Sequence, residues 1–241
     1  MASPAQAIIL AAGRGQRMRP LTDHTPKPLL KVRGRPLLQW HVDALSAAGV
    51  NRLVINTAWL GEQIPAHFGH PAQASDGESV DVTFSAEGED FGYALETAGG
   101  ISRALPLLEE VFWVVAGDVY APDFPFDAAA YARFVQSEHL AHLWLVPNPP
   151  HNPKGDFGLG TDGLAINGGT ERLTYSTIGL YRRELFLAPW CDILPGNPQG
   201  TAAPLAPLLR QAMDAGRVSA ERYDGTWIDV GTPQRLDELN R

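Results

Sequence analysis

The stretch Ala7-Ile8-Ile9-Leu10-Ala11-Ala12-Gly13-Arg14-Gly15-Gln16-Arg17 decides the fold that this sequence predicts. It opens with a short apolar run rich in β-branched residues, which is typical of a fully buried strand in a parallel sheet. The two glycines that follow allow a sharp turn and let backbone N–H groups approach an anion, and the arginines add charge-assisted contacts. We therefore expect a first buried strand that ends in a phosphate-binding loop.

Two familiar phosphate-binding loops do not match this stretch. The dinucleotide fingerprint requires a third glycine where Met18 stands, and the P-loop requires a Gly-Lys-Ser/Thr sequence that is missing here. The next apolar strand ends at Asn56, so no acidic residue follows it to bind a ribose. These differences argue against a nicotinamide cofactor and against a P-loop ATPase.

Strand-type apolar runs alternate with helix-type periodicity over the first half of the chain, which predicts an α/β fold with a doubly wound, mostly parallel sheet. The second half mixes in antiparallel pieces. A chain of 241 residues that is 44% hydrophobic can form one sizeable core, so we expect one domain spanning 1–241. The expected strands are 7–10, 53–55, 80–84, 112–116, 142–146, 173–181 and 226–228, and the expected helices are 36–48, 60–68, 95–108, 128–137 and 205–215.

The formal net charge of −8 argues against a nucleic-acid-binding surface, because phosphate backbones are bound mainly by clustered Lys and Arg. No apolar run approaches the roughly 20 residues needed to cross a bilayer. The first residues carry no targeting pattern, so we expect a cytoplasmic protein with no membrane partner. The lone Cys191 allows no internal disulfide, and no protein partner can be inferred.

One segment of this acidic chain is basic, which indicates either a compact anion site or a solvated positive face. It contains a single acidic residue, Asp23. Its seven basic residues are Arg14, Arg17, Arg19, Lys27, Lys31, Arg33 and Arg35.

Lys27 stands between Pro26 and Pro28 in the sequence Thr25-Pro26-Lys27-Pro28-Leu29-Leu30. Because prolines favour extended backbone, we expect Lys27 to lie outside any helix, with its side chain presented to a ligand. A solvent-exposed loop charge is the alternative. The glycine loop upstream favours the functional interpretation.

Two aspartates, Asp118 and Asp229, each follow an apolar strand, so one sheet could bring both carboxylates to a single site. Two hard oxygen ligands near phosphates suit Mg²⁺, which is commonly held by one or two carboxylates and phosphate oxygens. The alternative for either aspartate is a helix N-cap, and a helix is expected after Thr232.

The chain resembles the sugar-phosphate nucleotidyltransferases, also called nucleotide-sugar pyrophosphorylases. The resemblance rests on the segments 10–30, Glu96-Thr97-Ala98-Gly99-Gly100, Gly117-Asp118, Gly179-Leu180-Tyr181 and Asp229-Val230-Gly231-Thr232. It implies a Rossmann-like core of the nucleotide-diphospho-sugar transferase type, with Mg²⁺ on Asp118 and Asp229. It also implies a nucleoside triphosphate and a sugar 1-phosphate as substrates, with Lys27 between the two reacting phosphates.

Within this family, the chain is most similar to the N-acetylmuramate α-1-phosphate uridylyltransferases of peptidoglycan recycling. The similarity lies in Asn56-Thr57-Ala58-Trp59-Leu60-Gly61, Gly155-Asp156-Phe157 and Trp227-Ile228-Asp229. It implies that UTP and N-acetylmuramate α-1-phosphate react to give UDP-N-acetylmuramate and pyrophosphate. The alternatives are mannose 1-phosphate guanylyltransferase, glucose 1-phosphate thymidylyl- or uridylyltransferase, and a non-catalytic nucleotide-sugar sensor.

Position and resemblance together give a set of expected site residues. Arg17 and Lys27 are the expected catalytic cations, and no general base is required because the attacking phosphate is already ionised. The expected nucleotide-binding residues are Leu10, Ala11, Ala12, Gly13, Arg14, Gly15, Arg17, Glu87, Gly88, Thr97, Gly99 and Gly117. The expected sugar-phosphate-binding residues are Lys27, Trp59, Asp156, Tyr175 and Thr177, and Lys154 or Arg172 is the expected cation for a muramyl carboxylate.

Overall fold

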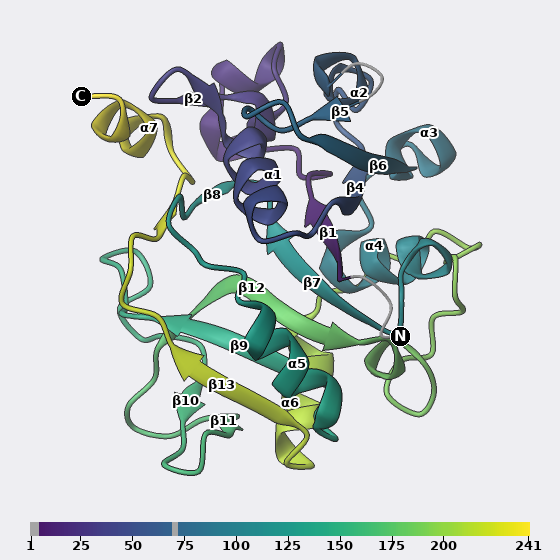
Figure 1. The fold of residues 1–241 in the computed structure, drawn as a ribbon, viewed down its shortest axis with the longest axis vertical. Helices are drawn as coiled ribbons and strands as arrows, with labels where there is room; N and C mark the ends of the chain where they lie inside the picture. Colours follow the sequence, from purple (N-terminus) through teal and green to yellow (C-terminus); the bar gives the residue numbers. More distant parts are fainter. Residues whose placement is uncertain (1–4, 69–71) are drawn as a thin grey trace.

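The computed structural model describes residues 5–68 and 72–241 and has one eight-stranded sheet at its centre (Figure 1). In chain order its strands are β1 Gln6–Leu10, β4 Arg52–Thr57, β5 Ala72–Gln73, β6 Ser79–Ala86, β7 Val111–Ala116, β9 Ala141–Val146, β12 Thr174–Arg182 and β13 Val218–Arg222. Across the sheet they lie in the order β13-β9-β12-β7-β1-β4-β6-β5. The six expected strands between residues 7 and 181 are therefore confirmed.

The strand order reverses in the middle of the sheet. β6, β4, β1 and β7 are parallel neighbours, whereas β12 runs antiparallel between β7 and β9. After β1 the chain builds β4 and β6 on one side and then crosses to β7 on the other. Open α/β sheets bind ligands at the carboxyl ends of the strands beside such a reversal. The predicted doubly wound, mostly parallel sheet with antiparallel pieces in its second half is confirmed.

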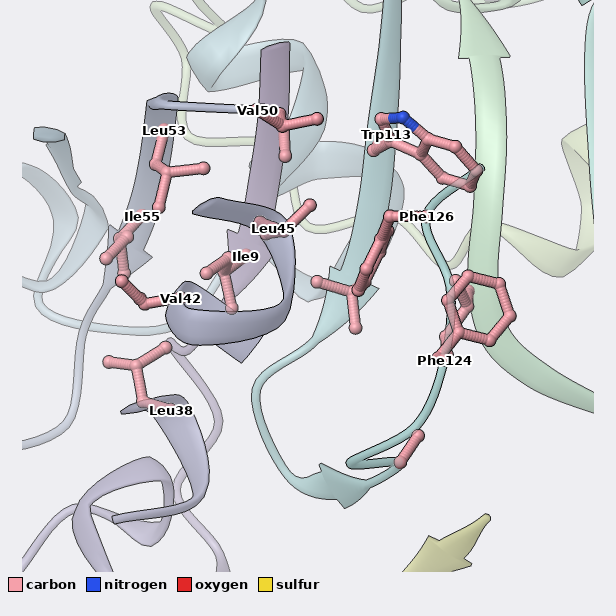
Figure 2. Packing of buried hydrophobic residues seen from close by; sticks show 14 of the residues in the cluster. Ile9, Leu38, Val42, Leu45, Val50, Leu53, Ile55, Trp113, Phe124 and Phe126 are labelled. Atoms are coloured by element: carbon pink, nitrogen blue, oxygen red, sulfur yellow. The ribbon is translucent and has the colours of Figure 1, made fainter. Parts of the chain in front are cut away.

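Helices cover both faces of this sheet (Figure 1). Successive side chains of β1 point to opposite faces, so Ile9 packs in one buried cluster with Leu38 and Leu45, whereas Ile8 packs in another with Ile101. Figure 2 shows the first of these clusters, in which aliphatic side chains meet Trp113, Phe124 and Phe126. The helices are α1 Leu37–Ala47, α2 Gln63–Phe68, α3 Glu87–Phe91, α4 Glu96–Ala104, α5 Ala128–Gln136, α6 Ala206–Asp214 and α7 Pro233–Leu239.

The C-terminal segment returns to the sheet reversal through a small ribbon. Asp229 pairs with Val119, the residue that follows Asp118. Val230 and Leu236 then pack in a third buried cluster with Met18, which lies in the loop after β1. The end of the chain is thus fixed beside the glycine loop. The two-stranded ribbons pair β2 Lys31–Val32 with β3 Arg35–Pro36, β8 Val119–Tyr120 with β14 Ile228–Asp229, and β10 Gly158–Leu159 with β11 Ala165–Ile166.

Several details differ from the sequence-based expectations, since α3, β5 and most strands of the small ribbons were not predicted. The strand expected at 226–228 forms only Ile228–Asp229, and it lies in the ribbon with β8 rather than in the central sheet. β13 was not predicted, because only Val218 and Ala220 of its five residues are buried, and this alternation is too short to signal a strand. Among the described residues, no helix is long and apolar enough to span a membrane.

Candidate active site

Three charged side chains from distant parts of the chain meet at the sheet reversal. Lys27 Nζ lies 2.7 Å from Asp118 Oδ2 and 3.9 Å from Asp229 Oδ1. The Lys27 side chain is 8% exposed, whereas that of Asp118 is 39% exposed. The ammonium is therefore sheltered between the carboxylates, and Asp118 remains open to a ligand.

The prediction that Lys27 lies in extended backbone outside any helix was wrong, and so was the alternative of a solvent-exposed loop charge. Lys27 begins a short 3₁₀ turn, Lys27–Leu29, and its side chain is buried. Proline is tolerated at the start of a helical turn, where its missing N–H is not needed, so Pro28 does not prevent the turn. The stem of Lys27 packs against Gly15, where a Cβ atom would come within 3.2 Å of Lys27 Cβ. Gly15 also has a φ of +65°, so both the close packing and the backbone conformation favour glycine at this position.

Asp229 is held in place by two further groups. Arg235 Nη1 donates to Asp229 Oδ2 at 2.9 Å and to its backbone oxygen at 3.0 Å, and His151 Nε2 lies 3.3 Å from Oδ2. The helix-cap alternative does not apply, because the Thr232 side chain caps α7 by accepting from the Arg235 backbone N–H. Asp118 precedes a strand rather than a helix. Both carboxylates are therefore available for a role in the site.

The donor set fits a magnesium ion. Asp118 Oδ1 has no hydrogen-bonding partner within residues 5–68 and 72–241, and Asp229 Oδ1 faces Lys27. No group of three potential metal-ligating side chains occurs in the described part of the chain. Mg²⁺ does not require one, since it commonly uses one or two carboxylates and completes its shell with phosphate oxygens and water.

The glycine loop lies beside these carboxylates with room for a ligand. Gly13 is exposed, and a Cβ atom built there would meet no atom within 4 Å. Arg14 stacks on Trp59, with its guanidinium carbon 3.6 Å from the ring centroid, and both side chains donate to the Thr22 carbonyl. Trp59 therefore braces the loop, and its expected contact with the sugar stays a prediction.

The buried carboxylate of Glu87 holds the glycine loop in place through Asn56. Glu87 accepts hydrogen bonds from Asn56 Nδ2 at 2.6 Å and from the Leu95 backbone N–H at 2.8 Å. Asn56 in turn accepts from the Ala11 backbone N–H at 2.7 Å. Burial raises the pKa of Glu87, and these two hydrogen bonds oppose the shift. Asn56 was not predicted as a site residue, although a polar residue at the end of an apolar strand could have indicated it.

A cleft of about 630 Å³ opens from this cluster and includes part of the predicted site. The predicted residues that line it are Leu10, Ala12, Gly13, Thr97, Asp118, Asp156, Tyr175 and Thr177. The lining residues that were not predicted include Asn56, Glu96, Phe157, Leu205, Leu209 and Arg210. The remaining predicted residues are not among those that line the cleft, and these are Ala11, Arg14, Gly15, Arg17, Lys27, Trp59, Glu87, Gly88, Gly99, Gly117 and Asp229.

Several of those remaining residues have structural surroundings of their own. A Cβ atom on Gly88 would lie 2.5 Å from the Ala58 carbonyl oxygen, and one on Gly99 would lie 2.4 Å from that of Thr201. Glycine at these two positions therefore lets neighbouring backbone approach closely, and contact with a nucleobase there stays a prediction. Arg17 is exposed and makes no ion pair among the described residues.

The wall of the cleft that faces the glycine loop contains a strained residue, Thr177. Thr177 has a φ of +63°, and its β-branched side chain makes this backbone conformation costly. β12 is irregular between Tyr175 and Gly179, and the Ser176 carbonyl accepts from Trp227 Nε1 at 2.8 Å. Strained backbone persists only where the surrounding structure holds it in place, and it is often found at ligand-binding sites.

Comparison with known proteins agrees with a phosphate-binding site at this position. A family model described as nucleotidyl transferase matches residues 6–163. The chain belongs to the nucleotidyl transferase family. An N-acetylmuramate alpha-1-phosphate uridylyltransferase of Neisseria meningitidis serogroup B is 50% identical over 97% of this chain and 96% of the relative. A protein of the same description from Caulobacter vibrioides is 31% identical over 96% of this chain and 94% of the relative.

Solved structures show the same fold at low sequence identity. A UDP-glucose pyrophosphorylase from Acinetobacter baumanii has a TM-score of 0.77 at 16% identity, with 98% of this chain and 92% of that chain covered. The expected nucleotidyltransferase family and its fold are therefore confirmed, and this nucleotidyl transferase is an enzyme of that class.

Proposed function

We propose that this nucleotidyl transferase makes UDP-N-acetylmuramate and pyrophosphate from UTP and N-acetylmuramate α-1-phosphate, in the cytoplasm and with Mg²⁺. The proposal that the protein catalyses this transfer rests on the position of Lys27. Its Nζ lies 2.7 Å from Asp118 Oδ2 and 3.9 Å from Asp229 Oδ1, beside the glycine loop. The substrate pair is supported by the 50% identity to the Neisseria meningitidis relative. Because the cleft takes residues from both halves of the sheet, residues 1–241 would act as one domain.

The reaction is an in-line attack by an oxygen of the sugar phosphate on the α-phosphorus of UTP. The P–O bond to the leaving pyrophosphate breaks as the new P–O bond forms. The nucleophile is already an anion, so no side chain has to remove a proton. The main obstacle is repulsion between two polyanions.

Positive charge in the site reduces this repulsion. Lys27 would neutralise charge on the equatorial oxygens of the transferred phosphoryl group, and its buried stem prevents the ammonium from swinging into solvent. Bound Mg²⁺ on Asp118 and Asp229 supplies further charge neutralisation. Arg17 and the loop N–H groups would hold the leaving pyrophosphate.

The two substrates would lie against different walls. The uridine end would lie near Thr97 and Asn56, which line the cleft beside β1 and β4. The sugar would lie against Asp156, Tyr175 and Thr177. Asp156 Oδ2 already accepts from the Tyr175 backbone N–H at 2.9 Å, so its carboxylate is held in a fixed position for sugar hydroxyls.

A pyrophosphate-release panel tests the proposal. UTP, GTP, dTTP and ATP would each be combined with the 1-phosphates of N-acetylmuramate, N-acetylglucosamine, glucose and mannose. The expected result is the highest kcat/KM for UTP with the muramyl compound. A preference for GTP with mannose 1-phosphate, or for glucose 1-phosphate with UTP or dTTP, would overturn the substrate assignment. Turnover with no pair would favour a nucleotide-sugar sensor.

A further inference from the structure

Arg210 lies on the cleft wall that the sugar would contact. It belongs to α6, which is anchored in the core by its buried residue Leu209 and by its buried N-cap residue Leu205. Ala206 and Arg210 are one helical turn apart, and both line the cleft. α6 packs against β11 and β13, and β13 is the edge strand on the other side of β12 from β1 and β4 (Figure 1). Arg210 is therefore set apart from the strands that carry the glycine loop.

The guanidinium of Arg210 is held by neutral groups. Its Nη1 donates to Asn167 Oδ1 at 2.6 Å, and its central carbon lies 5.2 Å from the ring centroid of Phe157. Asn167 is oriented in turn by Asp214, which accepts from Asn167 Nδ2 at 3.0 and 3.2 Å. Across residues 5–68 and 72–241, no carboxylate lies within 4.0 Å of an Arg210 nitrogen.

A half-buried arginine without a counter-ion in a substrate cleft indicates an anionic ligand. Guanidinium offers five N–H donors in a planar fork, and the structure uses one group of that fork for Asn167. The remaining donors match a carboxylate, which arginine binds through two parallel hydrogen bonds. The triphosphate has a separate set of cations in Lys27 and the glycine loop, so the anion at Arg210 is a different group.

We propose that Arg210 forms a carboxylate subsite that selects an acidic sugar. The inference rests on the proposed function, in which the sugar carries a lactyl carboxylate that N-acetylglucosamine lacks. Asp156 on the same wall would favour hydroxyl groups and repel a carboxylate placed wrongly. The cations expected from sequence, Lys154 and Arg172, are not among the cleft-lining residues.

The test compares two sugar phosphates in the same enzyme. Initial rates of pyrophosphate release with UTP would be measured for N-acetylmuramate 1-phosphate and N-acetylglucosamine 1-phosphate, in wild type, Arg210→Gln and Arg210→Lys. Arg210→Gln should lose about 100-fold in kcat/KM for the muramyl compound, as expected for one partner of a desolvated charge pair. Its kcat/KM for N-acetylglucosamine 1-phosphate and its KM for UTP should change by less than about threefold, within the range of a surface substitution.

Arg210→Lys keeps the charge but not the fork, so about a tenfold loss with the muramyl compound is expected. Arg222→Gln is the matched control, since Arg222 is exposed, pairs with Asp224 and is not among the cleft-lining residues. It should behave as wild type. Circular dichroism and thermal unfolding report that each variant is folded.

The outcomes separate the two claims. A wild-type enzyme that does not prefer the muramyl compound would overturn the proposed function. A wild-type preference that survives in Arg210→Gln would overturn the carboxylate subsite alone. Equal losses on both sugar phosphates would also overturn it, because they would indicate a general rather than a selective role for Arg210.

Discussion

One wall of the cleft comes from β1, β4 and α4, and the other comes from β12, α6 and the residues just before β10. On the first wall, a continuous glycine loop presents backbone, and the chain of hydrogen bonds from Glu87 through Asn56 to Ala11 fixes it. On the second wall, side chains such as Asp156, Thr177 and Arg210 come from separate segments. Backbone N–H groups suit phosphate, which is the same in every nucleotide. Scattered side chains suit a sugar, which differs from one enzyme to another, so specificity should be determined on the second wall.

Lys27→Ala should have the largest effect, because its ammonium lies between Asp229 and Asp118, and Asp118 lines the cleft. Electrostatic donors of this kind are worth about 3–4 kcal/mol at a transition state, so kcat should fall at least about 100-fold. The fold should survive, as judged by circular dichroism. Lys31→Ala is a suitable control, since Lys31 is exposed, and it should keep wild-type kcat. A loss of tenfold or less in Lys27→Ala would remove the role assigned to Lys27.

Glu87→Gln should weaken the first wall. Asn56 Nδ2 donates to Glu87 Oε1 and the Leu95 N–H donates to Oε2, so a glutamine, which has an NH₂ group in place of one oxygen, leaves one of these donors without its acceptor. A buried donor left without a partner costs about 1–3 kcal/mol, which should appear in the free energy of unfolding in urea. KM for UTP should rise more than KM for the sugar phosphate. The exposed neighbour Glu89 gives the control Glu89→Gln, and equal stability of the two variants would contradict the structural role of Glu87.

Thr177 allows a smaller test on the second wall. Thr177→Gly should stabilise the fold by about 1 kcal/mol relative to Thr177→Ala, because glycine adopts a φ of +63° without strain. Both variants lose the hydroxyl and should bind the sugar phosphate more weakly while KM for UTP stays unchanged. Thermal unfolding and steady-state kinetics measure the two effects. A glycine variant less stable than the alanine variant would show that Thr177 is not strained.

The two walls also differ in what the sequence could predict. The glycine loop, the buried strands and both aspartates were found because each has a local signature: a short motif, an apolar run, or a carboxylate at a strand end. Arg210 was missed because the sequence of α6 predicts only an ordinary amphipathic helix, and the position of that helix beside the cleft depends on tertiary packing. Asn56 was also missed, although it is a polar residue at the end of an apolar strand. The burial of Lys27 was also missed, because its position depends on Gly15 and on carboxylates far along the chain.

A magnesium titration of wild type and Asp118→Asn tests the central claim, that Asp118, Asp229 and Lys27 form the place where two polyanions react. Chelator-treated enzymes would be assayed for pyrophosphate release over increasing Mg²⁺ at fixed UTP and sugar phosphate. Wild-type activity should depend on the metal and saturate, whereas Asp118→Asn should show no saturable response over the same range, because it loses the more exposed carboxylate. A wild-type metal response in Asp118→Asn, or full wild-type activity without the metal, would contradict the account.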